Sequence, residues 1–121
     1  MANPFVHCEL MTTNTDKAKD FFQSLFEWKL EDMPMQDGGT YTMIRVGEGT
    51  GGGIMKNPMP GGGSVWVPYV LVDNVVAATA KAKSLGAKIY RDVSEIPNLG
   101  SFSIIADPTG GIMGLWQAKR K

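Results

Sequence analysis

The sequence contains one cysteine and one histidine, the adjacent residues Cys8 and His7. A single cysteine excludes an intramolecular disulfide and a multi-thiolate metal site, so a reducing compartment suits the chain. If the segment is a strand, neighbouring side chains point to opposite faces, and His7 and Cys8 do not form a catalytic pair. We expect Cys8 to be a buried structural thiol.

Long apolar runs and an excess of one charge are also missing. No run approaches the roughly 20 residues that cross a bilayer, and the start, MANPFVHCEL, lacks the basic and apolar stretches of a signal peptide. Acidic and basic residues balance at 12 each, and the only basic run is the terminal KRK. We therefore expect a cytoplasmic protein with neither a membrane nor a nucleic acid as partner.

What the chain does contain suits one compact domain, with 43% hydrophobic and 20% charged residues in 121 positions. Period-two and helical patterns predict a strand, a helix and three strands, after which the same order starts again. Asn14 or Thr13 is expected to cap the first helix and Asn74 or Asp73 the second, with Gly86 as a left-handed stop. The predicted boundaries are about 4–57 for module 1, 58–64 for a Pro- and Gly-rich connector, and 65–118 for module 2.

The two halves match at two offsets. A shift of 60 places Asn14 on Asn74 and Leu25 on Leu85, whereas a shift of 58 places Gly53–Met55 on Gly111–Met113. Similar β-turns could explain the second match alone, but the agreement in element order favours a true repeat. We predict an α+β fold in which two tandem βαβββ modules form one curved mixed sheet with a concave cavity.

The segments HCELMTTNTDKAKDFFQSLFEW, VLVDNVVAATAKAKSLGAKI and ADPTGGIMGLWQ, in this order and spacing, resemble the vicinal oxygen chelate superfamily. That group includes glyoxalase I, bleomycin-resistance proteins, fosfomycin-resistance enzymes and extradiol dioxygenases. In its metal-dependent members, the first and last strand of each half supply His, Gln or Glu ligands. By position, the resemblance places these ligands on His7, Lys56, Val67 and Gly114.

Only one of the four positions is suitable for a divalent ion. Valine and glycine side chains have no donor atom, and a lysine ammonium repels a cation. Even with Glu9 nearby, the set is too small, so we predict no metal and no cofactor.

Strand alternation predicts which side chains face the cavity. His7 and Glu9 are the candidate catalytic residues, and Ile54 is placed on the same face, with Met55 and Met113 turned toward the helices. The missing side chains at Val67 and Gly114 are expected to leave room for a ligand. The candidate ligand-binding residues are Tyr41, Met43, Arg45, Lys56, Tyr69, Ser103, Gly114 and Trp116.

Three functions are compatible with this pattern. The first is a metal-independent protein of the bleomycin-resistance type that binds a small, partly aromatic or apolar molecule. The alternative is a metal-independent enzyme, of lyase or isomerase type, with His7 as general acid or base and Glu9 orienting it. The third is a protein-interaction or regulatory module with no small ligand. In a purely structural reading of the cavity residues, Glu9 pairs with Lys56 or Arg45 and the aromatic residues pack against a dimer partner. The resemblance implies a homodimer, with Trp66 or Trp28 as the place for an apolar interface.

Overall fold

The computed structural model describes residues 2–36, 38–58 and 61–119. Within the predicted connector and the terminal KRK run, residues 59–60 and 120–121 lie outside the described part. The described chain has the predicted element order: β1 (Phe5–Thr12), α1 (Thr15–Leu25), β2 (Lys29–Pro34), β3 (Thr40–Arg45), β4 (Gly52–Lys56), β5 (Val65–Leu71), α2 (Val75–Ser84), β6 (Lys88–Ile96), β7 (Gly100–Ala106) and β8 (Ile112–Ala118).

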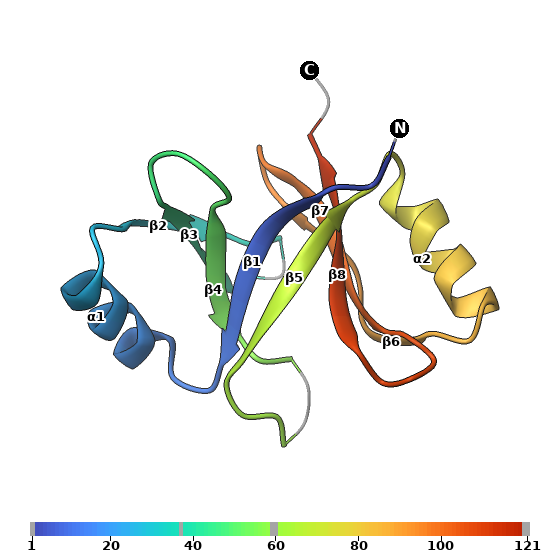
Figure 1. Ribbon diagram of the computed structural model, residues 1–121, viewed down its shortest axis with the longest axis horizontal. Helices are drawn as coiled ribbons and strands as arrows, with labels where there is room; N and C mark the ends of the chain where they lie inside the picture. Colours follow the sequence, from blue (N-terminus) through green and yellow to red (C-terminus); the bar gives the residue numbers. More distant parts are fainter. Residues whose placement is uncertain (1, 37, 59–60, 120–121) are drawn as a thin grey trace.

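All these strands form one mixed sheet, in the order β2-β3-β4-β1-β5-β8-β7-β6. Each half contributes four strands, and the halves meet where β1 pairs with β5 in antiparallel orientation. Within each half the first strand is parallel to the last, β1 to β4 and β5 to β8. The predicted fold of two βαβββ modules sharing a curved mixed sheet is confirmed (Figure 1).

The helices show why the shift of 60 is a structural repeat. Asn14 and Asn74 are the N-caps, and each side chain accepts a hydrogen bond from the backbone three residues later. Gly86 follows α2 with a φ of +99°, the left-handed conformation that ends helices. Among the described residues, no helix is long and apolar enough to cross a membrane.

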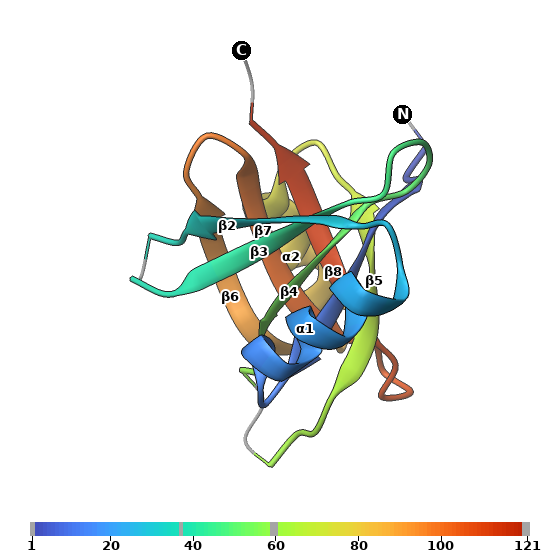
Figure 2. The ribbon, with the colours of Figure 1, turned by 90° about the vertical axis from the view of Figure 1, so that its left-hand side faces the viewer.

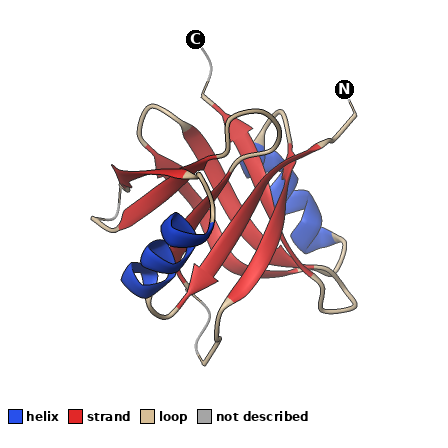
Figure 3. Cartoon of the chain, turned by 60° about the vertical axis from the view of Figure 1, so that its left-hand side comes forward, coloured by secondary structure: helices blue, strands red, loops and turns tan. Residues whose placement is uncertain are grey.

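Both helices lie on the outer, convex side of the curled sheet (Figure 3). Helix α1 covers Leu10, Ile44 and Ile54, and α2 covers Ile105 and Leu115. The two helices lie at opposite sides, with β1 and β5 between them (Figure 1). Cys8 lies on β1 and is exposed, so the expectation that it is buried is wrong.

The inner side of the curl holds the largest core cluster. The end of β2 lies beside β6 (Figure 2), and just beyond it the Gln36 amide donates to the Glu95 carbonyl at 3.4 Å. The enclosed residues are all less than a tenth exposed: Met11, Met35, Tyr41, Met55, Val67, Tyr69, Ile96, Phe102 and Ile104. The concave face is therefore filled by the protein's own side chains over most of its length.

The register of the last strands differs from the one that the sequence match suggested. Glu9 pairs with Gly53 on β4, and its counterpart in the second half, Tyr69, pairs with Gly114 on β8. Gly53 therefore corresponds in space to Gly114 and not to Gly111. The similarity of TGGGIMK and TGGIMG joins residues that occupy different places in the two modules.

Candidate functional site

His7 lies at one end of the concave face, and its side chain is partly buried. Its Nε2 atom lies 2.5 Å from the hydroxyl oxygen of Tyr41, which β3 supplies. The ring stacks nearly parallel to Trp116, with centroids 6.3 Å apart and planes 10° apart. Burial lowers the pKa of His7 from 6.5 to about 4. The imidazole is therefore neutral at physiological pH, with one nitrogen donating and one accepting.

Glu9 lies two residues further along β1 and has no exposed surface. The Tyr69 hydroxyl donates to its Oε2 at 2.5 Å. The Tyr41 hydroxyl also interacts with this carboxyl group, although Oε1 accepts no well-formed hydrogen bond from any residue described. Burial raises the pKa of Glu9 to about 7, against smaller lowering effects of the two tyrosines and of Arg91. Near neutral pH this carboxyl group can gain or lose a proton.

Both tyrosines stay protonated, and two glycines make room for them. Burial, followed by the nearby Glu9 charge, raises the pKa of Tyr41 and of Tyr69 well above the usual value. A Cβ atom at Gly53 would overlap the Tyr41 hydroxyl, and one at Gly114 would overlap the Tyr69 ring. The prediction that Gly114 leaves room for a ligand is therefore wrong, because the Tyr69 ring occupies that space.

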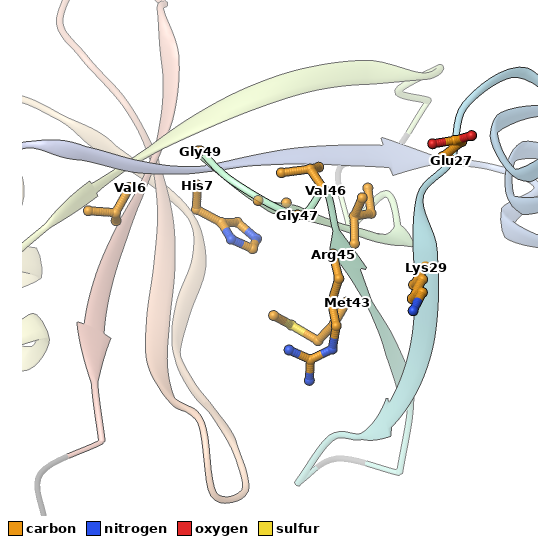
Figure 4. Close-up of a pocket in the computed structure, with 12 residues that line it drawn as sticks. Val6, His7, Glu27, Lys29, Met43, Arg45, Val46, Gly47 and Gly49 are labelled. Carbon is orange, nitrogen blue, oxygen red and sulfur yellow. The ribbon is translucent and has the colours of Figure 1, made fainter.

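A cavity of about 710 Å³ opens at the His7 end of this network. Its wall includes Met43, Arg45 and Lys29, together with the turn after β3, where Gly47 and Gly49 have positive φ angles. In Figure 4 the side chains of His7 and Met43 project toward one another across this space. The cavity therefore brings an apolar side chain and charged side chains to the same wall as the neutral His7 ring.

Charge within the cavity is partly balanced. Arg45 donates to a Glu31 carboxylate oxygen at 2.6 Å, on a pair of exposed side chains. Lys29 and Glu27 lie on the same wall. Arg45 is thus held in place without losing its access to solvent.

Other predicted site residues lie elsewhere. Lys56 is exposed and borders a separate depression of about 380 Å³ with Met35, Thr40 and Arg91. Ser103 is fully buried but faces α2, where its hydroxyl lies 2.8 Å from that of Thr79, so its predicted place on the concave face is wrong.

The predicted faces on β4 are reversed. Met55 belongs to the inner cluster, whereas Ile54 packs beneath α1. Met113 lies under α2, as predicted. The sequence match displaced β4 by three residues relative to β8, and any odd displacement reverses every side chain of a strand.

Sequence reasoning missed Arg91 and Phe102. The Arg91 guanidinium lies 5.3 Å from the centroid of the Phe102 ring and acts electrostatically on Glu9. Strand β6 has register shifts on both sides of Arg91, which interrupt the alternation that would have placed it. Phe102 was missed because β7 has apolar residues on both faces.

The donor set does not fit a divalent metal ion. With the register corrected, the four positions suggested by the resemblance hold His7, Gly53, Val67 and Gly114. No group of three His, Cys, Asp or Glu residues that could hold an ion occurs in the described ranges. We therefore assign no metal ligand, His7 included, and the absence of a metal stays a prediction.

Comparisons with known proteins agree with the observed fold. Residues 5–113 match the family model "Glyoxalase/Bleomycin resistance protein/Dioxygenase superfamily". The protein named "Putative glyoxylase CFP32" in Mycobacterium bovis is 32% identical over 107 residues, which are 88% of this chain and 41% of that protein. The Mycobacterium tuberculosis protein of the same name gives the same values. The chain thus spans less than half the length of these curated relatives.

Solved structures share the fold at low identity. Methylmalonyl-CoA epimerase from Mycobacterium tuberculosis has a TM-score of 0.68 and 14% identity, with 96% of this chain and 88% of that chain covered. A variant of the Streptomyces coelicolor methylmalonyl-CoA epimerase, in complex with 2-nitronate-propionyl-CoA, has a TM-score of 0.70 and 10% identity. That match covers 96% of this chain and 97% of the epimerase.

Proposed function

This chain belongs to the glyoxalase/bleomycin resistance protein/dioxygenase superfamily, and we propose that it binds a small, partly aromatic or apolar molecule beside His7 without a metal ion. The observation that carries the proposal is the cavity of about 710 Å³, since it places the neutral imidazole next to Met43 and Arg45. Cavities of this size hold small ligands, and a few polar groups in an apolar wall fix their orientation.

The occupied interior limits where the ligand lies. Met11, Tyr69 and Phe102 are at most 1% exposed, so the middle of the concave face has no space for a second molecule. The ligand therefore contacts the His7 end, with an apolar part against Met43 and a polar part toward His7 or Arg45.

The test is a thermal-shift screen of small aromatic and aliphatic compounds, followed by calorimetry on the ligands found. Arg45→Ala and Lys29→Ala alter the cavity, while Lys19→Ala is a matched control that breaks the exposed pair with Asp32 outside it. At least one cavity variant should weaken binding about tenfold, which is about 1.4 kcal/mol, and the control should not. Equal affinity in all three variants would refute this location.

A second function is favoured by the hydrogen bonds behind His7. A neutral imidazole backed by Tyr41 and a buried carboxyl group has the arrangement of an oriented general base. We propose, as the alternative, proton abstraction next to a carbonyl group. Carbonyl compounds from the screen, incubated in D₂O, should then exchange a carbon-bound hydrogen. His7→Gln should abolish the exchange, whereas Lys56→Ala should retain it; exchange unaffected by His7→Gln would exclude this function.

For assembly we propose a homodimer through the face that α1 shares with Trp66. Phe21, Leu25, Phe26 and Trp66 expose 44–59% of their surface there, and Trp66 contacts α1 through Phe22. Light scattering should give a dimer mass for the wild type and a monomer mass for Trp66→Ser. Leu85→Ser, at an exposed site beyond α2, is the matched control and should leave the mass unchanged.

A further inference from the structure

Three side chains connect the buried interior to the His7 cavity. The Glu9 carboxyl group interacts with the Tyr41 hydroxyl, and that hydroxyl lies 2.5 Å from His7 Nε2. His7 Nδ1 forms no hydrogen bond to any residue described, yet it is not among the buried atoms that lack a partner. Nδ1 therefore keeps some exposed surface on a residue that lines the cavity, and a chain of exchangeable protons leads from His7 through Tyr41 to Glu9.

This chain has two consistent proton arrangements. Once the Tyr41 hydroxyl turns toward the ionised Glu9 carboxylate, it donates to that group, and His7 Nε2–H donates to the Tyr41 oxygen. Nδ1 then presents a lone pair to the cavity. When Glu9 is protonated, it donates to the Tyr41 oxygen, Tyr41 donates to Nε2, and the imidazole proton is on Nδ1.

One proton from solvent converts the first arrangement into the second. Water in the cavity gives a proton to Nδ1, Nε2 passes its proton to Tyr41, and Tyr41 passes its own to Glu9. His7 and Tyr41 each end with the number of protons they had before, and only Glu9 has gained a proton and changed charge. His7 stays neutral in both states, and only the position of its proton changes.

We propose that Glu9, acting through Tyr41, determines whether His7 offers the cavity a hydrogen-bond acceptor or a donor, and thereby which class of ligand binds. With Glu9 protonated, the site prefers ligands with an acceptor such as a ketone or aldehyde oxygen; with Glu9 ionised, it prefers ligands that donate. This inference rests on the proposed binding function and specifies its chemistry. Tyr41 and Glu9 are positioning residues, since neither needs to touch the ligand.

The switch falls in an accessible pH range. The groups that act on Glu9 come from three strands, Tyr41 on β3, Tyr69 on β5 and Arg91 on β6, and His7 on β1 is linked to it through Tyr41. Burial outweighs the lowering effects of both tyrosines and Arg91, so the pKa of Glu9 is about 7. The pKa of His7, lowered to about 4, keeps the ring neutral while Glu9 titrates.

The single histidine makes the test direct. Protein labelled with ¹⁵N-histidine gives one imidazole, whose two nitrogen shifts report which nitrogen carries the proton. Between pH 5.5 and 8.5, a range that spans the Glu9 pKa of about 7, the proton should move from Nδ1 to Nε2 as pH rises. Glu9→Gln, whose amide donates like the protonated acid, should keep the proton on Nδ1 throughout.

Two further variants separate the relay from a local effect. Tyr41→Phe breaks the chain, so the pH-dependent movement near neutrality should disappear. Tyr69→Phe removes a hydrogen bond that lowers the pKa of Glu9, so the midpoint should move to higher pH. Amide spectra check that both variants are folded. An imidazole that keeps one tautomer across the range in the wild type, or that still switches in folded Tyr41→Phe, would overturn the inference.

A ligand measurement then tests the chemical class. Acetophenone is an uncharged probe whose oxygen only accepts, so its affinity should fall severalfold from pH 6 to pH 8 in the wild type. In Glu9→Gln its affinity should be independent of pH. The tautomer is observed without any ligand, so failure to find ligands contradicts the proposed function alone. If acetophenone binds but the His7 tautomer stays fixed, or if its affinity does not depend on pH, the relay alone is contradicted.

Discussion

Replacing Glu9 by glutamine should uncover a compensation between two buried groups in the pH dependence of stability. The pKa of Glu9 is raised to about 7, so the folded state holds this proton more tightly than the unfolded state. The contribution of Glu9 protonation to the free energy of unfolding is complete below pH 4.5 and is lost as pH rises to about 7. The pKa of His7 is lowered to about 4. The stabilisation from the neutral imidazole is therefore complete above pH 6.5 and is lost as pH falls to about 4.

The two contributions have similar size and opposite direction. Each corresponds to about 3 kcal/mol, at roughly 1.4 kcal/mol per pH unit. Between pH 4.5 and 6.5 they nearly cancel, so these two groups leave the wild-type free energy of unfolding almost flat there. Glu9→Gln removes one of them, and its stability should rise by about 3 kcal/mol from pH 4 to pH 6.5. At pH 8 the variant should exceed the wild type by a similar amount, because no charge is buried.

The assay is urea unfolding at half-unit steps from pH 4 to pH 8, chosen to bracket both pKa values, with the variant curve compared to the wild type. The difference cancels every other titrating group that the two proteins share. His7→Gln should give the opposite slope, with stability falling as pH rises through the same range. If Glu9→Gln and the wild type give parallel curves over the whole range, the account of Glu9 as a buried proton-binding group is wrong.

Three substitutions test packing and surface contributions. Each is measured by the midpoint of urea unfolding, with an unchanged dependence of the unfolding free energy on urea concentration. Gly114→Ala should destabilise by roughly 3 kcal/mol or more, because its methyl group overlaps the Tyr69 ring, and an unchanged midpoint would contradict that packing. Asn74→Ala should cost about 1 kcal/mol through loss of the α2 cap; no loss would mean the cap adds nothing. Arg45→Ala should cost less than about 1 kcal/mol since its pair with Glu31 is exposed, and a larger loss would show a buried role.

The first part of each module was predictable from the sequence because it contains directional signals. Asn14 and Asn74 each precede a helical pattern by the same distance, and Gly86 ends the second helix. Caps and left-handed stops depend on local backbone chemistry, so they fix a helix whatever surrounds it. The shift of 60 was correct for this reason.

The last strands were less predictable, since glycine-rich similarity carries no information about which face a residue occupies. The match of Gly53 with Gly111 ignored the turn before β8, and in the structure Gly53 occupies in module 1 the place that Gly114 occupies in module 2. Ser103 shows a second cause. Strand β7 is buried on both faces, so its polar residues do not mark the side of a cavity, and Ser103 instead pairs with Thr79 beneath α2.

The tyrosine placed over Gly114 makes the two positions depend on one another. A glutamate introduced at 114 would start from a Cβ that the Tyr69 ring already occupies. Shortening Tyr69 first would leave a void and remove a hydrogen bond to Glu9. Each single step is unfavourable although the pair of changes is compatible, which is sign epistasis. Converting this chain into a carboxylate-ligated metalloprotein would therefore require both substitutions together, and a search through single mutants would miss the route.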